Sequence, residues 1–373
     1  MIKYLGSKRT LLDSITRIIK SAGNVSTVLD LFSGTARVGH ALKSAGFVVH
    51  SNDHNAYAST LATCYVQADK SSVEADAQKL IAEFNSLAGK PGYFTETFCE
   101  KSRFFQPKNG ARIDAIREAI ASKSLPPELS AVLLVSLMEA ADRVDSTTGV
   151  QMAYLKQWAA RAHNDLNLRM PDLRDCVKPG HCRAYNLEAK EAAKIKVDLA
   201  YLDPPYNQHS YLGNYHIWES LVLWDKPEVY GIACKRLDVR ERKSRFNSKK
   251  EFKDAMREML SNLNATSLLV SFSNEGFVTR DEMLALLEHV PGKKRHVCVI
   301  EHDYKRYVGA QIGIHNLKGE KVGQVSHLRN TEYMFLCTHT PVDTTMLTSS
   351  GKAVDTELPL GYPFDLTKPQ GPS

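Results

Sequence analysis

The sequence predicts an α/β fold of the Rossmann-like type, in which a mostly parallel sheet is interrupted by a helical insertion. Three observations support this. A strand, a helix and a second strand follow one another within residues 27–51 of the 373-residue chain. The middle of the chain then has helical periodicity and few strand-like runs. Short apolar runs typical of buried strands return after residue 196, which indicates that the sheet is built in two parts.

The first part is a β-α-β unit. Residues 27–32 (TVLDLF) form a short apolar run that ends at Ser33 and Gly34, as a buried strand does. We expect a helix over residues 36–45 and a second strand over residues 47–51. Such a unit favours parallel strands joined by right-handed crossovers.

The middle region, residues 56–175, has helical periodicity and is expected to be a helical insertion. Apolar residues spaced three and four apart, as over residues 114–120, are typical of amphipathic helices, and residues 11–19 show the same spacing. Loops are expected where Gly and Pro cluster, at residues 89–92, 107–110 and 126–127.

Four later runs are strand-like, namely residues 197–202, 267–272, 296–300 and 333–337. The sequence therefore predicts one sheet domain formed by residues 1–59 and 181–340, with a helical insertion over residues 60–180. Residues 341–373 are rich in Pro, Gly, Ser and Thr and predict a loose tail.

Composition and charge narrow the class of protein. A hydrophobic fraction of 43% and a charged fraction of 24% are typical of a soluble globular chain. The longest apolar run, residues 131–138, is too short to span a membrane, and the N-terminus has no secretory signal pattern. Seven cysteines without a CxxC pair argue against a disulfide framework or a zinc cluster. We therefore expect a cytoplasmic protein without a metal or a membrane contact.

The first candidate site is the turn after the first strand, residues 30–39 (DLFSGTARVG). A turn that ends a strand and opens a helix presents backbone N–H groups to a ligand. It matches neither the GxGxxG motif nor a P-loop, and its leading acid suits a ligand with a cationic amine, such as S-adenosylmethionine. The residues expected around this ligand are Asp30, Phe32, Ser33, Gly34 and Thr35.

Asp53 ends the second strand, about twenty residues beyond this turn. A carboxylate there can accept both ribose hydroxyls of a nucleoside. Either Asp30 or Asp53 by itself could equally cap a turn, whereas the two acids at this spacing favour a nucleoside site.

The most informative motif is Asp203-Pro204-Pro205-Tyr206, which directly follows a strand. Two consecutive prolines remove two donors, which leaves carbonyls free and the loop rigid. A carboxylate beside a carbonyl gives two acceptors for an exocyclic amine, and the Tyr206 ring offers a surface on which a base can stack. We therefore predict that these four residues are catalytic.

Together these motifs resemble the alpha-group, adenine-specific DNA methyltransferases, which depend on S-adenosylmethionine. That family has a Lys-Tyr/Trp-x-Gly-x-Lys motif, a cofactor loop, a target-recognition region and a DPPY motif. Residues 3–8 (KYLGSK), 30–39 and 203–206 follow this order, and the resemblance covers roughly residues 1–340. It implies a methyltransferase sheet whose insertion, residues 60–180, recognises the DNA target.

The resemblance also implies the roles of single residues. Those that would hold the methionine part of the cofactor are Tyr4, Lys8, Asp30 and Gly34, and Asp53 would bind the ribose. In the family an acid shortly before DPPY reads the cofactor's adenine edge. Glu188 stands at about that distance, although the family more often has Asp, and Asn186 is the alternative.

The implied reaction moves a methyl group from S-adenosylmethionine to the N6 amine of an adenine flipped out of double-stranded DNA. Tyr206 would stack on the base, while Asp203 and the Pro204 carbonyl would accept the two amine hydrogens. The aromatic residues that follow could line the base pocket or simply pack in a helix: His209, Tyr211, Tyr215, His216 and Trp218.

Residues 235–258 hold ten basic and five acidic side chains, a net charge of +5 against +6 for the whole chain. Such a run can be a solvated face, but this one lies just after the catalytic segment, where phosphate contacts are useful. The expected phosphate contacts are Lys243, Arg245, Lys249 and Lys250. Candidates for reading bases from the insertion are Arg103, Lys108, Asn109, Arg112 and Arg143.

The function that the sequence favours is therefore site-specific methylation of DNA adenine. Amine methylation of RNA or of a protein glutamine is one alternative, and a non-catalytic DNA-binding module is another. A restriction endonuclease that acts as a separate protein is a further partner that the resemblance allows. The sequence does not give the recognition site.

Overall fold

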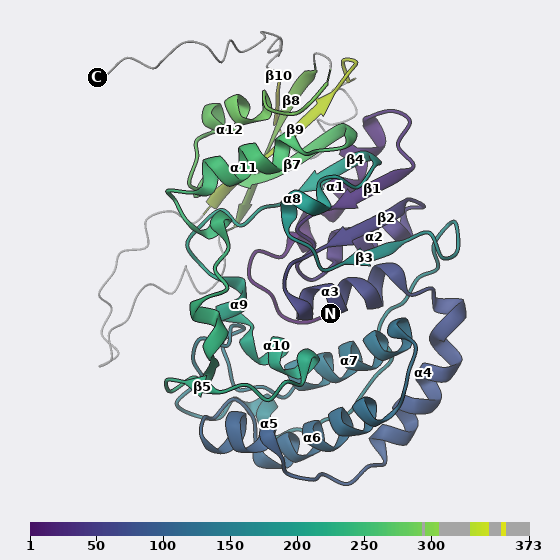
Figure 1. Ribbon diagram of the computed structural model, residues 1–373, viewed down its shortest axis with the longest axis vertical. Coiled ribbons are helices and arrows are strands. Elements are labelled where there is room, and N and C mark those ends of the chain that lie inside the picture. Colours follow the sequence, from purple (N-terminus) through teal and green to yellow (C-terminus); the bar gives the residue numbers. More distant parts are fainter. Residues whose placement is uncertain (293–294, 306–328, 343–351, 356–373) are drawn as a thin grey trace.

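The computed structural model describes residues 1–292, 295–305, 329–342 and 352–355, which form a half built on a sheet and a half built of helices (Figure 1). Within these residues the main sheet has eight strands in the order β10-β8-β9-β7-β4-β1-β2-β3. The strands are β1 (Thr27–Asp30), β2 (Val48–Asn52), β3 (Arg183–Tyr185), β4 (Val197–Leu202), β7 (Ala265–Ser273), β8 (His296–Lys305), β9 (Arg329–Thr338) and β10 (Lys352–Asp355).

The strands β3, β2, β1, β4 and β7 are parallel neighbours, whereas β9 runs antiparallel between β7 and β8. The prediction of a mostly parallel, Rossmann-like sheet in two parts is therefore confirmed, and β3 is a strand that the sequence reasoning missed. In register, Asp30 of β1 lies beside Ser51 of β2 and Tyr201 of β4. The carboxyl ends of these three strands consequently meet at one edge of the sheet.

Alternating residues of the strands pack against two layers of helices. On one face, Val28 and Leu199 pack with residues of α1 (Leu12–Ser21), α2 (Arg37–Ser44) and α3 (Ala56–Ala62). On the other face, Leu29 and Ala200 pack with residues of α8 (Ala189–Ala192), α11 (Phe252–Ser261) and α12 (Arg280–Leu287). This period of two is what a strand buried on both faces requires.

The helical half contains α4 (Lys70–Asn85), α5 (Tyr93–Thr95), α6 (Pro107–Ser122) and α7 (Pro127–Asp142), with π-helical turns η2 (Thr63–Gln67) and η3 (Glu96–Glu100). Its core is continuous with the sheet face that α1 and α2 cover. Helix α10 (His216–Leu223), which follows the DPPY segment, packs against α3 and α7 and ties the halves together.

Two expectations for this half are wrong. The loop expected at residues 107–110 is the first turn of α6, because Pro107 is at a first-turn position that needs no N–H donor. Gly110 lies inside this helix, where a Cβ would collide with Cys99 Sγ. Helical structure also stops at Asp142 rather than near residue 175: residues 143–182 contain only the 3₁₀ turn η4 (Ala160–His163) and an isolated bridge. Side chains of α6 donate hydrogen bonds to the Asn164 and Leu166 carbonyls of this segment, which satisfies these two acceptors outside a helix.

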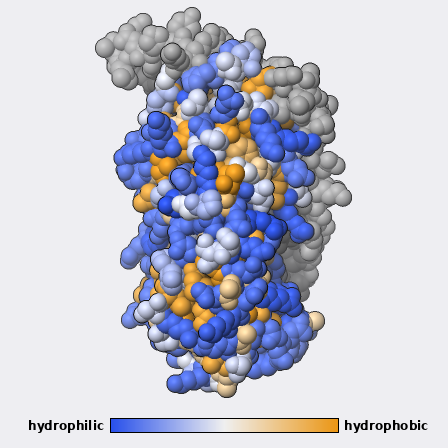
Figure 2. Space-filling model, turned by 90° about the vertical axis from the view of Figure 1, so that its right-hand side faces the viewer, coloured by the Kyte–Doolittle hydropathy of each residue, from blue (hydrophilic) through white to orange (hydrophobic). Residues whose placement is uncertain are grey.

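The remaining elements are short. They are η1 (Lys8–Thr10), α9 (Tyr211–Asn214), the hairpin of β5 (Val229–Tyr230) and β6 (Lys235–Arg236), η5 (Leu237–Arg240) and η6 (Arg245–Asn247). The expected loose tail is wrong for residues 352–355, which form β10 against β8, while the rest of that stretch beyond residue 342 lies outside the described residues. Within the described ranges, no helix has the length and apolar character needed to cross a bilayer. Figure 2 shows a largely hydrophilic face with small hydrophobic patches in both halves.

Candidate active site

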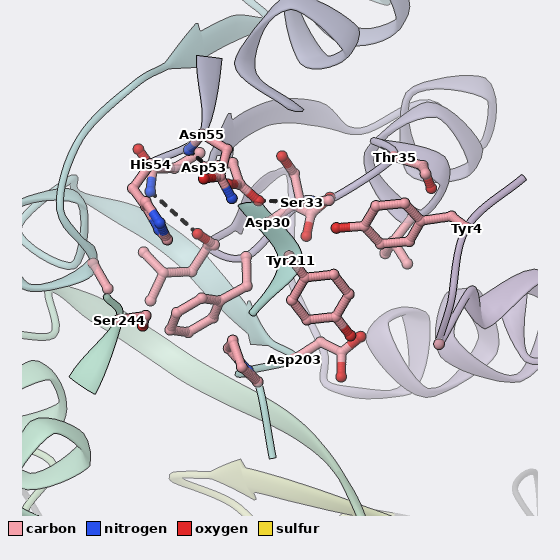
Figure 3. Close-up of a pocket in the computed structure, with 18 of the residues that line it drawn as sticks. Tyr4, Asp30, Ser33, Thr35, Asp53, His54, Asn55, Asp203, Tyr211 and Ser244 are labelled. Carbon is pink, nitrogen blue, oxygen red and sulfur yellow. Dashed lines mark hydrogen bonds between the residues drawn. The ribbon is translucent and has the colours of Figure 1, made fainter. Parts of the chain in front are cut away.

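A pocket lies where the carboxyl ends of β1, β2 and β4 meet (Figure 3). Its walls come from residues 4–8, from the turn after β1, from residues 52–55 after β2 and from the segment after β4. Segments 187–189 and 242–247 complete it. The three motifs quoted from the sequence therefore converge on one cavity, because parallel strands end at the same edge of a sheet.

The turn after β1 is shaped by two left-handed residues, Gly34 (φ +50°) and Ala36 (φ +58°). A Cβ at Gly34 would lie 3.2 Å from the Tyr4 ring, so glycine permits this close approach. The Gly34 N–H donates to Asp53 Oδ2 at 3.0 Å, and the Asn55 N–H donates to Asp53 Oδ1 at 3.0 Å. Asp53 thus caps both turns while its carboxylate faces the pocket, so the capping and nucleoside interpretations are compatible.

Asp30 ends β1 and is almost fully buried. Its Oδ2 atom accepts the Gly39 N–H at 3.0 Å, and no cation contacts its carboxylate among the residues that the structure describes. The pKa of Asp30 is raised to about 7, mainly by burial. The Gly39 hydrogen bond lowers this pKa, and the nearby Asp203 and Asp53 carboxylates raise it. A cationic group bound in the pocket would relieve this cost.

Several polar atoms around the pocket are buried and have no hydrogen-bond partner among the residues that the structure describes, which is unusual in native proteins. They are Ser7 Oγ, Ser33 Oγ, Asn55 Oδ1 and the Tyr201 hydroxyl, all on residues that line the cavity. Together with the unpaired acid Asp30, they fit a polar ligand that carries a positive charge and several hydrogen-bonding groups.

Asp203 follows β4 and contacts Lys8, whose ammonium Nζ lies 3.0 Å from Asp203 Oδ1. The same Nζ lies 2.6 Å from Oε1 of Glu332 on β9. Burial raises the pKa of Asp203 to about 6; the Lys8 charge lowers it and the Glu332 charge raises it. Lys8, which we predicted to hold the methionine part of a cofactor, therefore lies against the Asp203 carboxylate that we predicted to be catalytic.

The rest of the DPPY segment is held by packing and one backbone bond. Pro204 is buried, Pro205 lines the pocket, and the Tyr206 ring packs edge-on against Phe272 with centroids 6.1 Å apart. The Tyr206 carbonyl accepts the Phe277 N–H at 3.1 Å, which ties the loop to the end of β7.

The aromatic residues after this segment divide into two groups. Tyr211 lines the pocket and stacks on Tyr4 with ring centroids 5.2 Å apart. Tyr215, His216 and Trp218 are buried and pack within the fold, and burial lowers the pKa of His216 to about 3. His209 is exposed. Of the two alternatives left open by the sequence, Tyr211 therefore lines the pocket, whereas the three buried residues pack within the fold.

Glu188 and Asn186 lie beside the pocket without lining it. Glu188 is exposed and precedes α8, between the lining residues Leu187 and Ala189. Asn186 donates through Nδ2 to the Asp53 carbonyl at 2.8 Å. Which of the two would meet a nucleoside base stays a prediction.

The basic run, residues 235–258, reaches the rim of the pocket. The sequence predicted that this run lies near the catalytic segment, but not which of its residues line the pocket. Arg242, Ser244 and Asn247 line the cavity, and none of them was predicted as a site residue. Asn247 Nδ2 donates to the carbonyls of Asn207 and His209 at 2.8 and 3.0 Å, which anchors the loop after Tyr206. Its position within the run was the only sequence signal that could have found it.

The four predicted phosphate contacts differ in their pairing. Arg245 forms an ion pair with Glu258 at 2.5 Å. Lys243, Lys249 and Lys250 are exposed and form no ion pair among the described residues.

The candidate base-reading residues of the insertion contact their own chain. Asn109 is 1% exposed; its Nδ2 donates to the carbonyls of Ala162 and Asn164, and its Oδ1 accepts the Leu166 N–H. The amide of Asn109 is thus buried and already satisfied, which argues against base reading by this residue; that role stays a prediction. The others are partly exposed or exposed. Arg112 donates to the carbonyls of Asn85, Leu87 and Leu166. Arg143 donates to the Asn167 carbonyl, Lys108 to Asp165, and Arg103 stacks over Trp158.

The chain is similar to a known protein family and to several known proteins. Residues 4–282 match the family model of the D12 class of N6 adenine-specific DNA methyltransferases. The chain is 31% identical to the modification methylase StsI of Streptococcus sanguinis over 77% of its own length and 46% of that protein, and 32% identical to the Type II methyltransferase M.FokI of Planomicrobium okeanokoites over 77% and 47%. It thus spans about half the length of these two relatives. It is 27% identical to the Type II methyltransferase M.NlaIII of Neisseria lactamica over 90% of its own length and 98% of that protein.

Proposed function

Because the chain belongs to the D12 class of N6 adenine-specific DNA methyltransferases, we propose that it methylates the exocyclic N6 amine of adenine at a specific site in double-stranded DNA. One observation carries the proposal. Asp203 and Pro205 of the DPPY segment line the same pocket as the turn after β1, which supports an amine acceptor beside a cationic-ligand site.

The residues present fit S-adenosylmethionine, which supplies an activated methyl group when bound. Asp30 would pair with the amino group of its methionine part, beside the Gly34 backbone and the Tyr4 ring. Asp53 would accept the ribose hydroxyls, and Glu188 or Asn186 would meet the adenine edge. The unpartnered Ser33 and Asn55 oxygens support a polar ligand of this kind.

The flipped adenine would enter beside Tyr206 and present its amine to Asp203 Oδ2 and the Pro204 carbonyl. These acceptors draw the nitrogen lone pair out of conjugation and stabilise the positive charge that develops on nitrogen. As the new N–C bond forms, the bond between the methyl group and the cofactor sulfur would break and leave that sulfur as a neutral thioether. The amine loses one proton, which the Asp203 carboxylate would accept. Because the pKa of Asp203 is about 6, we expect the rate to rise with pH through about 6 as this carboxyl ionises.

The basic run would hold the DNA. Lys243 and Arg245 alternate with the pocket residues Arg242 and Ser244, so phosphates bound there would lie next to the flipped base. Lys249 and Lys250 would extend this contact. The helical insertion, residues 60–180, would recognise the target sequence.

A methyl-transfer assay tests the proposal. The purified chain is incubated with methyl-labelled S-adenosylmethionine and, separately, double-stranded DNA, RNA or protein. We expect label in DNA adenine only, and a loss of about 10²–10³-fold in Asp203→Asn, the scale for removing one oriented transition-state group. The matched control is Asp254→Asn, an exposed acid on α11, which should keep the wild-type rate.

Label in RNA or in protein instead of DNA would favour the first alternative, and DNA binding without transfer to any substrate would favour a non-catalytic module. Single-molecule sequencing of DNA from expressing cells would then identify the methylated site. The relatives are named a modification methylase and a Type II methyltransferase, which supports a separate restriction endonuclease as partner. Isolation of an endonuclease from the same cells, whose cleavage of DNA is blocked by the identified methylation, would test this partner.

A further inference from the structure

The ammonium of Lys8 lies between two carboxylates, and only one of them belongs to a recognised motif. Asp203 is the acid of the DPPY segment, whereas Glu332 lies on β9, beyond the residues 4–282 that match the family model. Lys8 is 8% exposed and Glu332 is 1% exposed. A buried carboxylate without a structural purpose is costly, so the position of Glu332 needs an explanation.

Glu332 is fixed from two sides. Its Oε1 atom accepts hydrogen bonds from the Lys8 ammonium and from the Ser271 hydroxyl on β7. In the sheet, Glu332 lies opposite Ser273 of β7 and His302 of β8. It therefore has one orientation, and the ammonium that it holds is directed at Asp203 Oδ1.

We propose that Glu332 is a positioning residue that acts through Lys8. It fixes the ammonium against Oδ1 of Asp203, leaves the second carboxylate oxygen to the target amine, and keeps the cluster of three groups negative. The inference rests on the proposed methyl transfer, because it assigns Glu332 a role in preparing Asp203 for that reaction.

The electrostatic reason follows from counting charges. A single Lys8–Asp203 pair would be neutral and would weaken Asp203 as an acceptor. A second carboxylate shares the ammonium and leaves a net charge of −1, which favours positive charge developing on the amine nitrogen. In agreement with this, the Glu332 charge raises the pKa of Asp203 and the Lys8 charge lowers it.

The other titratable groups near this cluster do not replace Glu332. Tyr201, Tyr206 and Tyr211 face Lys8 or Asp203, but burial raises the pKa of Tyr201 and Tyr211 well above 10, so these two stay neutral. Asp30 is near Asp203 on the cofactor side, without a contact to Lys8. Glu332 is thus the carboxylate that shares Lys8 with Asp203 in the described part of the chain.

The test measures the ionisation of Asp203 directly. Full-length protein carrying ¹³C-labelled aspartate carboxyls is titrated by NMR without ligands, and the Asp203 signal is identified by its loss in Asp203→Asn. We expect the pKa of Asp203 to fall by about one unit in Glu332→Gln and to rise by at least about one unit in Lys8→Met, since one neighbouring charge shifts a pKa by about 1–3 units. The matched control, Glu301→Gln on β8, should leave it unchanged.

The pH profile of kcat gives the second measurement. Its acidic limb should move to lower pH in Glu332→Gln. We expect kcat to fall about tenfold, which corresponds to one pKa unit or about 1.36 kcal/mol. KM for S-adenosylmethionine should be nearly unchanged. Glu332→Asp, which keeps the carboxylate, should restore part of both effects. If Glu332→Gln does not fold, Glu332→Asp carries the test, with a smaller shift in the same direction.

An Asp203 titration that stays the same in folded Glu332→Gln, or in Glu332→Asp when that variant carries the test, would overturn the inference. Because the NMR titration needs neither DNA nor S-adenosylmethionine, its result is independent of the proposed function. Absence of methyl transfer in the wild-type chain would refute the proposed function, while an unchanged titration would refute the role of Glu332.

Discussion

The pocket at the edge of the sheet and the helical insertion use the same kinds of polar residue in opposite ways. Around the pocket, Ser33, Asn55 and Tyr201 have buried polar atoms without partners, and Asp30 is a buried acid without a cation in the described part of the chain. In the insertion, the amide of Asn109 is fully used inside the protein. Both regions are rich in hydrogen-bonding groups, so residue type alone does not distinguish them.

The difference shows which property marks a binding site. A buried polar group without a partner costs free energy, which a bound ligand or a solvent molecule can offset. A satisfied amide such as that of Asn109 stabilises the fold and has nothing left to offer a base. Substitutions in the two regions should therefore affect different measurements.

In this comparison, the largest effect on ligand binding is expected at Asp30. In Asp30→Asn, S-adenosylmethionine should bind about 10–100-fold more weakly, because a charged hydrogen-bond partner contributes about 1.5–3 kcal/mol. Binding is measured by calorimetry, which should also show wild-type affinity rising with pH through about 7 as Asp30 ionises. Equal affinity in wild type and variant at pH 8 would contradict the assignment.

Asp30→Asn should also change how the stability of the ligand-free chain depends on pH. The pKa of Asp30 is raised from 3.8 to about 7 in the folded protein, so its ionisation opposes folding, and the ligand-free chain should lose stability as pH rises from about 4 through 7. Asp30→Asn should flatten this part of the curve. Thermal unfolding at pH 5 and pH 8 measures it, and a variant curve as steep as that of the wild type would count against it.

Asn109→Ala should give the reverse pattern. We expect a loss of about 2–3 kcal/mol in the free energy of unfolding, because buried partners lose their hydrogen bonds, with unchanged affinity for S-adenosylmethionine and unchanged DNA sequence preference. Urea denaturation measures the stability, and the exposed neighbour Lys108→Ala is the control. A stable variant with altered sequence preference would show that Asn109 reads bases after all.

The smallest effects should distinguish the lysines of the basic run. Lys249→Gln and Lys250→Gln should each weaken DNA binding a few-fold and reduce the slope of log K against log salt by about one. Arg245→Gln should change the slope less, because Glu258 already neutralises the arginine. Binding is measured by fluorescence anisotropy at several salt concentrations, with Lys20→Gln on α1 as a control. Slopes that do not differ between Lys249→Gln and Lys20→Gln would refute the phosphate contacts.

Sequence reasoning predicted features whose cause is local. The strands β1, β2 and β4, helix α2 and the polar residues at their ends follow from apolar runs and turn residues close together in the chain. It failed where local patterns are ambiguous: Pro107 and Gly110 suggest a loop but begin α6, and residues 143–175 contain only the 3₁₀ turn η4 and an isolated bridge although the residues before them are helical.

The sequence by itself determined the α/β fold, the order of the motifs and the identity of the groups at the strand ends, because each depends on neighbouring residues. Only the tertiary structure decided which of these groups are available and which are paired. Lys8, Asp203 and Glu332 come from three distant segments. The sheet brings the carboxylates of Asp203 and Glu332 within 3.0 Å of the Lys8 ammonium. Such a cluster has no sequence signal, since charge sharing depends on distances that only folding sets.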